Sequence, residues 1–210
     1  MAERPLLIGL TGSIGMGKSE TAKLFARLGI PVYDSDAAVH RLYEPGGAAV
    51  TPIEAAFPGT VKEGRVDREE LSRQVRERGD GLQELETIVH PLVRDSQQRF
   101  LAENAKAAMV LLDVPLLFET GGHARMDAVV VVSAPHHIQR ERVLARQGMT
   151  PEKLDHILSR QMPDAEKRAQ AHFVVETDKG LDDAFEQVKK IVATLRQTRA
   201  VQDGQKNGNA

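Results

Sequence analysis

The sequence predicts an α/β fold, in which a parallel five-stranded sheet carries helices on both faces. Five short apolar segments separated by helical ones are the expected strands, and they span residues 6–10, 31–33, 109–114, 128–132 and 172–176. Several of these segments are continuously apolar rather than alternating, as is typical of strands covered on both faces. A glycine-rich loop that joins the first strand to the first helix is the third observation.

This loop, Gly12-Ser13-Ile14-Gly15-Met16-Gly17-Lys18-Ser19, matches the Gly-x-x-x-x-Gly-Lys-Ser/Thr pattern of phosphate-binding P-loops. Glycines let the backbone approach phosphates closely, so that N–H groups and the positive end of the next helix face the anion. We expect Lys18 to reach the β- and γ-phosphates and the hydroxyl of Ser19 to bind Mg²⁺. An ordinary glycine-rich turn is the alternative, and the flanking strand and helix argue against it.

The composition is that of one globular domain, with 210 residues of which 41% are hydrophobic and 28% charged. The absence of cysteine excludes disulfides and thiolate chemistry. A formal net charge of -2 gives no general attraction to nucleic acid or anionic membranes, and no apolar run has the length of a membrane helix. We expect a cytoplasmic protein that binds neither nucleic acid nor membrane; its oligomeric state is left open.

The strand pattern is interrupted after the second strand. Residues 37–106 exceed what one crossover helix needs and predict an inserted helical subdomain that holds the substrate. Within it, His90-Pro91 is expected to interrupt the helical stretch 82–105 and to offer an anion contact, a buried structural histidine being the alternative. The main domain is expected to end with an amphipathic helix near residue 198, and residues 199–210 are expected to form a disordered tail.

Two aspartates, Asp34 and Asp36, directly follow the second strand. Ligands of such sheets bind beyond the carboxyl ends of the strands, so these carboxylates are the best candidates for catalysis. We expect Asp36 to act as the base that accepts the proton of an attacking hydroxyl, and Asp34 to orient the substrate. Alternatively, Asp34 merely caps the following helix.

Asp113 ends the third strand, where nucleotide-binding folds place a carboxylate that holds Mg²⁺. A register shifted by one residue would instead point it into a helix layer. Glu119 lies in the loop beyond this strand and is expected to contact metal or substrate, with a solvated loop acid as an equal alternative.

The charged segment 134–171 predicts a helical lid over the phosphates. Arg142 and Arg146 are spaced four apart and are therefore expected on one helix face. Arginine binds phosphate oxygens bidentately, so both are expected to neutralise charge that develops during transfer. A solvated charged helix is the alternative.

The motifs together resemble those of the dephospho-CoA kinase family across nearly the whole chain. The matching segments are residues 8–12, 17–19, 34–36, 44–46, 88–93, 115–119 and 161–162, with Arg142 and Arg146. The resemblance implies transfer of the γ-phosphate of ATP to the ribose 3′-hydroxyl of dephospho-coenzyme A, with Asp36 as base and with activity that depends on Lys18 and Arg142. Two places depart from the family pattern: His40 stands where Arg is frequent, and Glu176-Thr177-Asp178-Lys179-Gly180 stands where an acidic residue followed by Asn before a glycine is usual.

The expected site has three sets of residues besides the catalytic Lys18, Asp36 and Arg142. ATP is expected at Gly12, Ser13, Ile14, Gly15, Met16, Gly17, Lys18, Ser19, Glu20 and Arg146. The substrate is expected at Asp34, Asp36, His40, Arg41, His90, Leu117 and Glu119, and Mg²⁺ at Ser19 and Asp113.

Other functions are considered on the same residues. Another small-metabolite or nucleotide kinase with a P-loop would share the glycine loop and the lid. A non-catalytic nucleotide switch is a second alternative, but the Asn-Lys-x-Asp sequence that reads guanine is absent. An ATP-dependent nucleic-acid protein is disfavoured by the acidic net charge and by the few aromatic residues.

Overall fold

The structure is a computed structural model that describes residues 4–207. The chain divides into two compact units: residues 1–32 together with 104–210, and residues 33–103. We call the first the sheet unit and the second the helical unit.

Within the described residues, a five-stranded sheet has the strand order β2-β5-β1-β6-β7. The strands are β1 (Leu6–Thr11), β2 (Val32–Asp34), β5 (Met109–Asp113), β6 (Ala128–Ser133) and β7 (Phe173–Glu176). β1 pairs in parallel with both β5 and β6, and β6 pairs in parallel with β7. The predicted α/β fold is confirmed, and each predicted strand is present within one or two residues of its expected bounds.

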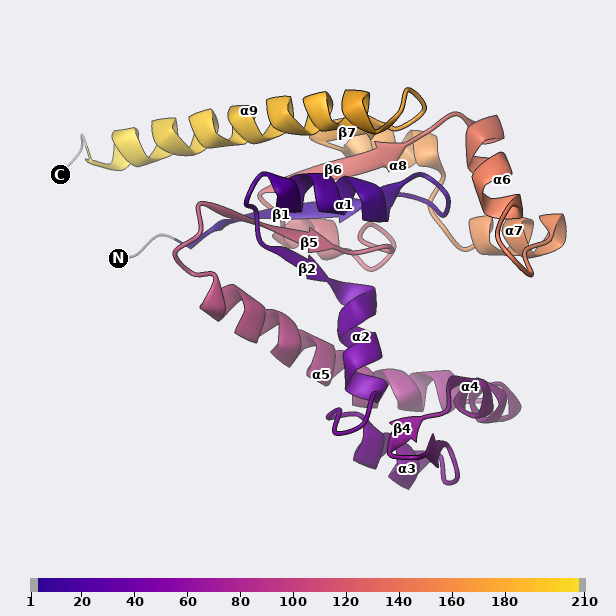
Figure 1. The fold of residues 1–210 in the computed structure, drawn as a ribbon. Helices are drawn as coiled ribbons and strands as arrows, with labels where there is room; N and C mark the ends of the chain where they lie inside the picture. The colour runs from indigo at the N-terminus through magenta and orange to yellow at the C-terminus, as the bar shows by residue number, and fades with distance from the viewer. Residues whose placement is uncertain (1–3, 208–210) are drawn as a thin grey trace. The chain divides into compact units, whose positions relative to one another are not determined.

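Both faces of this sheet are covered (Figure 1). On one face, Val130 and Val132 of β6 pack against α1 (Lys18–Arg27) and α9 (Leu181–Asn207). On the other face, Val129 and Val131 pack with Leu117, Phe118 and Met162. Successive strand residues point to opposite faces, so a strand buried on both sides is expected to be continuously apolar, as β6 is from Ala128 to Val132.

The remaining helices of the sheet unit follow β5 and β6. They are the short 3₁₀ helix η1 (Gly122–Arg125), α6 (His136–Leu144), α7 (Pro151–Leu158) and α8 (Asp164–Gln170). The last three lie within the segment predicted as a lid.

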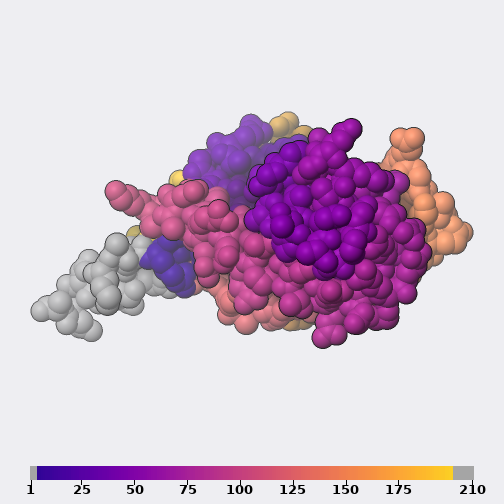
Figure 2. All heavy atoms as spheres, turned by 90° about the horizontal axis from the view of Figure 1, so that it is seen from below, coloured from indigo at the N-terminus to yellow at the C-terminus, as the bar shows by residue number. Residues whose placement is uncertain are grey.

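The helical unit has its own apolar core, and its spheres are purple to magenta in Figure 2. Its elements are α2 (Ser35–Tyr43), α3 (Val50–Ala56), β3 (Val61–Lys62), β4 (Arg65–Val66), α4 (Arg68–Glu77) and α5 (Gly81–Glu103). Ile53, Phe57, Leu71 and Val89 are buried together in that core. The antiparallel hairpin of β3 and β4 was not expected from the sequence.

Helix α5 corrects the prediction that His90-Pro91 interrupts a helix. The helix runs without a break from Gly81 to Glu103 and contains Pro91 in its interior. Val89 is buried and Leu92 and Val93 pack against the same core, so packing on both sides of Pro91 offsets the backbone hydrogen bond that proline cannot donate.

Helix α9 continues to Asn207, past the end expected near residue 198. Residues 199–207 include the helix formers Arg199, Ala200 and Gln202 as well as the unfavourable Gly204, and a helix already fixed by its packed part can extend through such a segment. The structure therefore differs from the disordered tail predicted for 199–210, of which 208–210 lie outside the described residues. From residue 4 to residue 207, no helix combines the length and the apolar character needed to cross a membrane.

Candidate active site

The P-loop begins where β1 ends and closes on the first turn of α1. Gly15 and Gly17 adopt left-handed backbone conformations, with φ of 80° and 94°. Gly12 has no room for a side chain, since a Cβ there would lie 2.6 Å from the carbonyl oxygen of Val132. These constraints explain why glycine occupies the two glycine positions of the motif, Gly12 and Gly17, and also position 15. Ser13 and Met16 are buried, whereas Ser19 and Glu20 are exposed on the first turn of α1.

Lys18 and Asp113 form an ion pair below this loop. The Nζ atom of Lys18 lies 2.5 Å from Oδ1 of Asp113, and the aspartate side chain is only 3% exposed. The orientation of Asp113 toward the P-loop lysine answers the register question left open by the sequence. The buried carboxylate therefore lies directly beside the lysine of the P-loop motif, which is the residue expected to contact phosphate.

The backbone of Ile14 is held from two sides by residues that the sequence analysis did not assign. Its N–H donates to Oε1 of Gln161 at 3.1 Å, and its carbonyl accepts from Nε2 of Gln139 at 2.8 Å. Gln139 is buried in α6 although glutamine is usually exposed. This unusual burial could not be read from the sequence, which shows only two ordinary polar residues in a charged segment.

Arg142 of α6 contacts the residue that follows β7. Its Nη1 donates to Oγ1 of Thr177 at 2.8 Å and its Nη2 donates to the carbonyl of Thr177 at 2.7 Å. Helix α6 ends at Leu144, so Arg146 lies in the turn beyond it and is exposed. The expectation that both arginines share one helix face is therefore wrong, because the helix is shorter than the charged segment suggested.

Glu119 joins the loop after β5 to the lid segment. Its Oε1 lies 2.8 Å from Nζ of Lys167, a lysine of α8 with a fully buried side chain, and also accepts the N–H of Met162 at 2.8 Å. Burial alone would raise the pKa of Glu119, but the hydrogen bonds from Lys167 and the backbone outweigh it and the pKa is lowered. Glu119 is thus an internal ion-pair partner in this structure, rather than the solvated loop acid considered as the alternative.

Leu117, which was expected to bind substrate, is buried in the core below the sheet. Its side chain packs against Gly9 and Gly122, where added Cβ atoms would come within 3.0 Å of it. The neighbouring Leu116, in the loop after β5, is 41% exposed to solvent.

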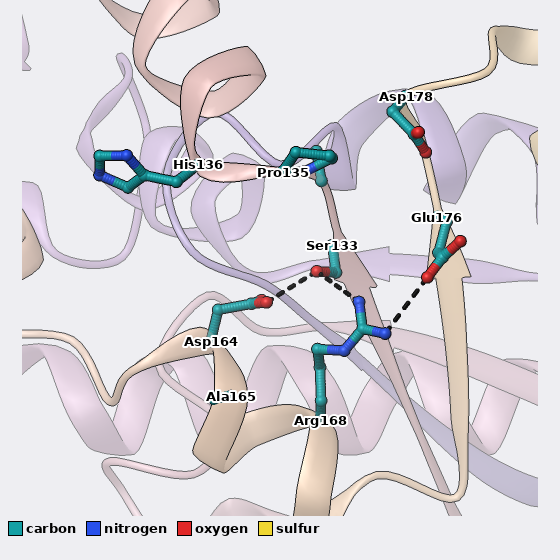
Figure 3. A pocket seen from close by; sticks show the side chains of 9 residues that line it. Ser133, Pro135, His136, Asp164, Ala165, Arg168, Glu176 and Asp178 are labelled. Carbon is teal, nitrogen blue, oxygen red and sulfur yellow. Dashed lines mark hydrogen bonds and ion pairs between the residues drawn. The ribbon is translucent and has the colours of Figure 1, made fainter.

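A pocket of about 490 Å³ opens after the carboxyl ends of β6 and β7 (Figure 3). On its wall, Ser133 donates to Asp164 at 2.7 Å, and Arg168 bridges the oxygens of Ser133 and Glu176. Figure 3 shows that His136 points away from this cluster. A second pocket of about 330 Å³ is lined by Ser13 and Met16 of the P-loop and by residues of the lid segment, including Gln161. Both pockets lie where sheets of this kind bind ligands.

In the helical unit, Asp34 and Asp36 have different surroundings. Asp34 is the N-cap of α2, and its Oδ1 accepts the N–H of Ala37 at 2.9 Å. The capping role that the sequence left open is therefore observed. Asp36 lies in the first turn of α2 and is exposed, as expected for a carboxylate available to a substrate.

The other predicted substrate residues of this unit lie on its surface. His40 Nδ1 lies 2.9 Å from Nη2 of Arg68 and 3.4 Å from Oε1 of Glu44, so it belongs to a local polar cluster. Arg41 and His90 are exposed, which excludes the buried structural role considered for His90.

The residues predicted to hold Mg²⁺ carry suitable ligand atoms. The hydroxyl of Ser19 and the carboxylate of Asp113 are hard oxygen donors of the kind Mg²⁺ prefers, and Mg²⁺ commonly takes only one or two protein ligands beside phosphate oxygens. In the described part of the chain, no cluster of three or more His, Cys, Asp or Glu side chains suited to a metal occurs.

Comparison with known proteins gives a consistent answer. A model of the dephospho-CoA kinase family matches residues 6–183. A dephospho-CoA kinase from Rhodopseudomonas palustris (strain HaA2) is 59% identical over 189 residues, which cover 89% of this chain and 94% of that protein. One from Nitrobacter winogradskyi is 57% identical over 190 residues, covering 90% and 94%.

Solved structures agree. TT1252 from Thermus thermophilus has a TM-score of 0.80 at 37% identity and covers 91% of this chain and 98% of that one. Dephospho-CoA kinase from Campylobacter jejuni has a TM-score of 0.64 at 20% identity, covers 90% and 96%, and supports the fold alone. With a family model that spans both units and relatives more than half identical along nearly their whole length, this chain belongs to the dephospho-CoA kinase family.

Proposed function

We propose that this chain transfers the γ-phosphoryl group of ATP to the ribose 3′-hydroxyl of dephospho-coenzyme A, giving coenzyme A and ADP in the last step of coenzyme A biosynthesis. The observation that carries the proposal is the family match over residues 6–183, together with curated relatives that are named dephospho-CoA kinase and are up to 59% identical. Because the reaction draws on the ATP and coenzyme pools of the cell interior, the proposal includes a cytoplasmic location.

Lys18 and Arg142 supply the positive charge for the transfer. As the bond between the γ-phosphorus and the bridging oxygen of ADP breaks, negative charge spreads over the phosphoryl oxygens and the leaving group. The P-loop amides and Lys18 stabilise that charge around the β- and γ-phosphates, and Arg142 stabilises it from the lid. Magnesium held by Ser19 and Asp113 would, when bound, neutralise phosphate charge and align the β- and γ-oxygens.

Asp36 is the proposed base. The 3′-oxygen forms the new bond to the γ-phosphorus, and its proton passes to the carboxylate of Asp36. Exposure of Asp36 in the first turn of α2 supports this role, whereas the side chain of Asp34 is engaged in capping that helix. Asp34, His40, Arg41 and His90 remain proposed substrate contacts, since they lie on the surface of the helical unit.

The test is an ADP-release assay with ATP and Mg²⁺, in which dephospho-coenzyme A is compared with AMP, adenosine and shikimate and the products are checked by mass. The proposal predicts ADP release that depends on dephospho-coenzyme A, with a product heavier by one phosphate group. Release with another acceptor of the panel, but not with dephospho-coenzyme A, would overturn the substrate assignment.

A further inference from the structure

Thr177 contacts two parts of the active site through one hydroxyl group. Its Oγ1 lies 2.7 Å from the carbonyl oxygen of Met16, in the P-loop, and 2.8 Å from Nη1 of Arg142, in the lid segment. Thr177 is the first residue after β7, and its N–H donates to the carbonyl of Ser133 at 3.0 Å, which fixes its backbone to the sheet.

The direction of these hydrogen bonds is determined by the groups involved. A guanidinium has donors but no acceptor, so Oγ1 of Thr177 must accept from Arg142. The single hydrogen of the Thr177 hydroxyl is therefore free to be donated to the carbonyl oxygen of Met16, which can only accept. The second donor of the arginine, Nη2, binds the carbonyl of Thr177 itself at 2.7 Å. Two donors of the guanidinium are therefore fixed by one residue.

Close packing adds to this arrangement. A Cβ placed on Gly17, the residue before Lys18, would lie 3.2 Å from Oγ1 and 3.3 Å from Cγ2 of Thr177. Thr177 thus lies directly against the turn of the P-loop that leads into the catalytic lysine, and the same side chain holds Arg142 there.

We infer that Thr177 is a positioning residue that aligns Arg142 with the phosphate-binding loop for phosphoryl transfer. The effect on phosphoryl transfer rests on the proposed function, whereas the contact between Thr177 and Arg142 does not. The long side chain of Arg142 loses conformational entropy when its guanidinium binds the transferring phosphoryl group. The two hydrogen bonds to Thr177 already fix that side chain, so less entropy is lost in the transition state. The effect should therefore appear in kcat rather than in nucleotide affinity.

Two substitutions separate the hydroxyl from the shape of the side chain. Thr177→Val retains the branched shape and the backbone carbonyl but removes the hydroxyl, whereas Thr177→Ser retains the hydroxyl and removes the methyl group. We expect Thr177→Val to lower kcat on the order of tenfold, with the KM for ATP and the affinity for ADP changed by less than about threefold. Thr177→Ser should restore most of kcat. Equal kcat in wild type and Thr177→Val would overturn the inference.

A double-mutant cycle shows whether Thr177 acts through Arg142. In an Arg142→Ala background, Thr177→Val should cause no further loss of kcat, because the side chain that it positions is gone. A loss as large as in the wild-type background would mean that the hydroxyl acts only by supporting the P-loop, and it would contradict the positioning role.

Hydrogen exchange of the Arg142 side chain, measured by NMR and assigned with Arg142→Lys, tests the contact without substrate. We expect its Nη1 hydrogens to exchange more slowly than those of exposed arginines, and faster in Thr177→Val. Equal rates in the two proteins would overturn the inference even if the enzyme is active. An inactive wild-type enzyme with the expected exchange difference would instead contradict the proposed function and retain the link between Thr177 and Arg142.

Discussion

The ammonium group of Lys18 lies 2.5 Å from a carboxylate oxygen of Asp113, so the lysine of the P-loop motif meets the last residue of β5, more than ninety positions along the chain. The parallel pairing of β1 with β5 brings them together, since Leu10 is opposite Asp113 in the register of these strands. The lysine of the P-loop and the acid expected to hold Mg²⁺ are thus set by the same two neighbouring strands.

Replacing Lys18 by Ala should abolish turnover. In the proposed mechanism the variant loses the positive charge beside the β- and γ-phosphates. Removal of one neutral hydrogen-bond donor already lowers kcat on the order of 10² to 10³, and loss of a full charge should cost more. The measurement is ADP release at saturating substrates, together with the melting temperature to confirm that the protein is folded.

Lys23→Ala is the matched control for that variant. Lys23 is an exposed lysine of the same helix, with an ion pair to Glu20 at 2.7 Å. Its removal should leave kcat near the wild-type value. If both variants lose activity equally, the loss does not come from the phosphate-binding position of Lys18.

Asp36→Asn should lower kcat on the order of 10² or more and leave ATP binding largely unchanged, because an amide cannot accept the proton of the 3′-hydroxyl. Glu69→Gln is a suitable comparison, since Glu69 is another exposed acid in the first turn of a helix of the same unit. Steady-state kinetics with dephospho-coenzyme A give kcat and the KM for ATP of both variants. An Asp36→Asn enzyme with wild-type kcat would exclude Asp36 as the base.

The buried pair of Lys167 and Glu119 predicts a large effect on stability. Lys167→Met leaves the carboxylate of Glu119 without its cation, and breaking a buried pair on one side costs about 3 to 5 kcal/mol. Adding Glu119→Gln to this variant should recover part of the loss, because no unpaired charge then remains. Urea denaturation of the two variants and the wild type measures these differences, and a double variant less stable than Lys167→Met would contradict this explanation.

The same pair predicts a pH dependence. The pKa of Glu119 is lowered in the folded protein, so its contribution to stability is present above the ordinary carboxyl pKa of about 4.5 and is lost as the pH falls through the lower folded value. The unfolding free energy of Glu119→Gln should therefore fall less steeply below pH 4.5 than that of the wild type. Parallel pH profiles of the two proteins would show that Glu119 is not the titrating group.

Pro91→Ala tests the uninterrupted helix α5. Alanine restores the backbone N–H and is favoured over proline inside a helix by up to about 3 kcal/mol. We expect the variant to melt at a higher temperature than the wild type. A lower melting temperature would mean that the helix bends at Pro91 in a way that its packing requires.

The fold was predictable from the sequence because its strongest signals are local. Continuous apolar strands such as β6, and a glycine loop between a strand and a helix, each correspond to one element. The hairpin of β3 and β4 was missed because each strand has two residues and one of them is polar, which leaves no alternating pattern. Its signal was the turn at Glu63 and Gly64, both of which have positive φ.

The sequence indicates candidate site residues only where they lie in a recognisable motif or directly after a strand. The sequence placed Lys18 and Asp113 at the ligand edge of the sheet, where the structure shows them paired. The contacts of Gln139, Gln161 and Thr177 with the P-loop join residues more than a hundred positions apart. The adjacent leucines at 116 and 117 look alike in the sequence, and only the structure shows that the side chain of Leu117 is buried whereas that of Leu116 is exposed. Such pairings depend on the tertiary fold and leave no periodic trace.

The proposed reaction is tested by identifying the product that the purified protein forms from ATP and dephospho-coenzyme A. The product is analysed by mass and by ³¹P NMR, with Lys18→Ala as the inactive control. We predict one added phosphate group on the ribose 3′-oxygen and an equal amount of ADP. Unchanged dephospho-coenzyme A, or a phosphate on any other oxygen, would contradict this prediction.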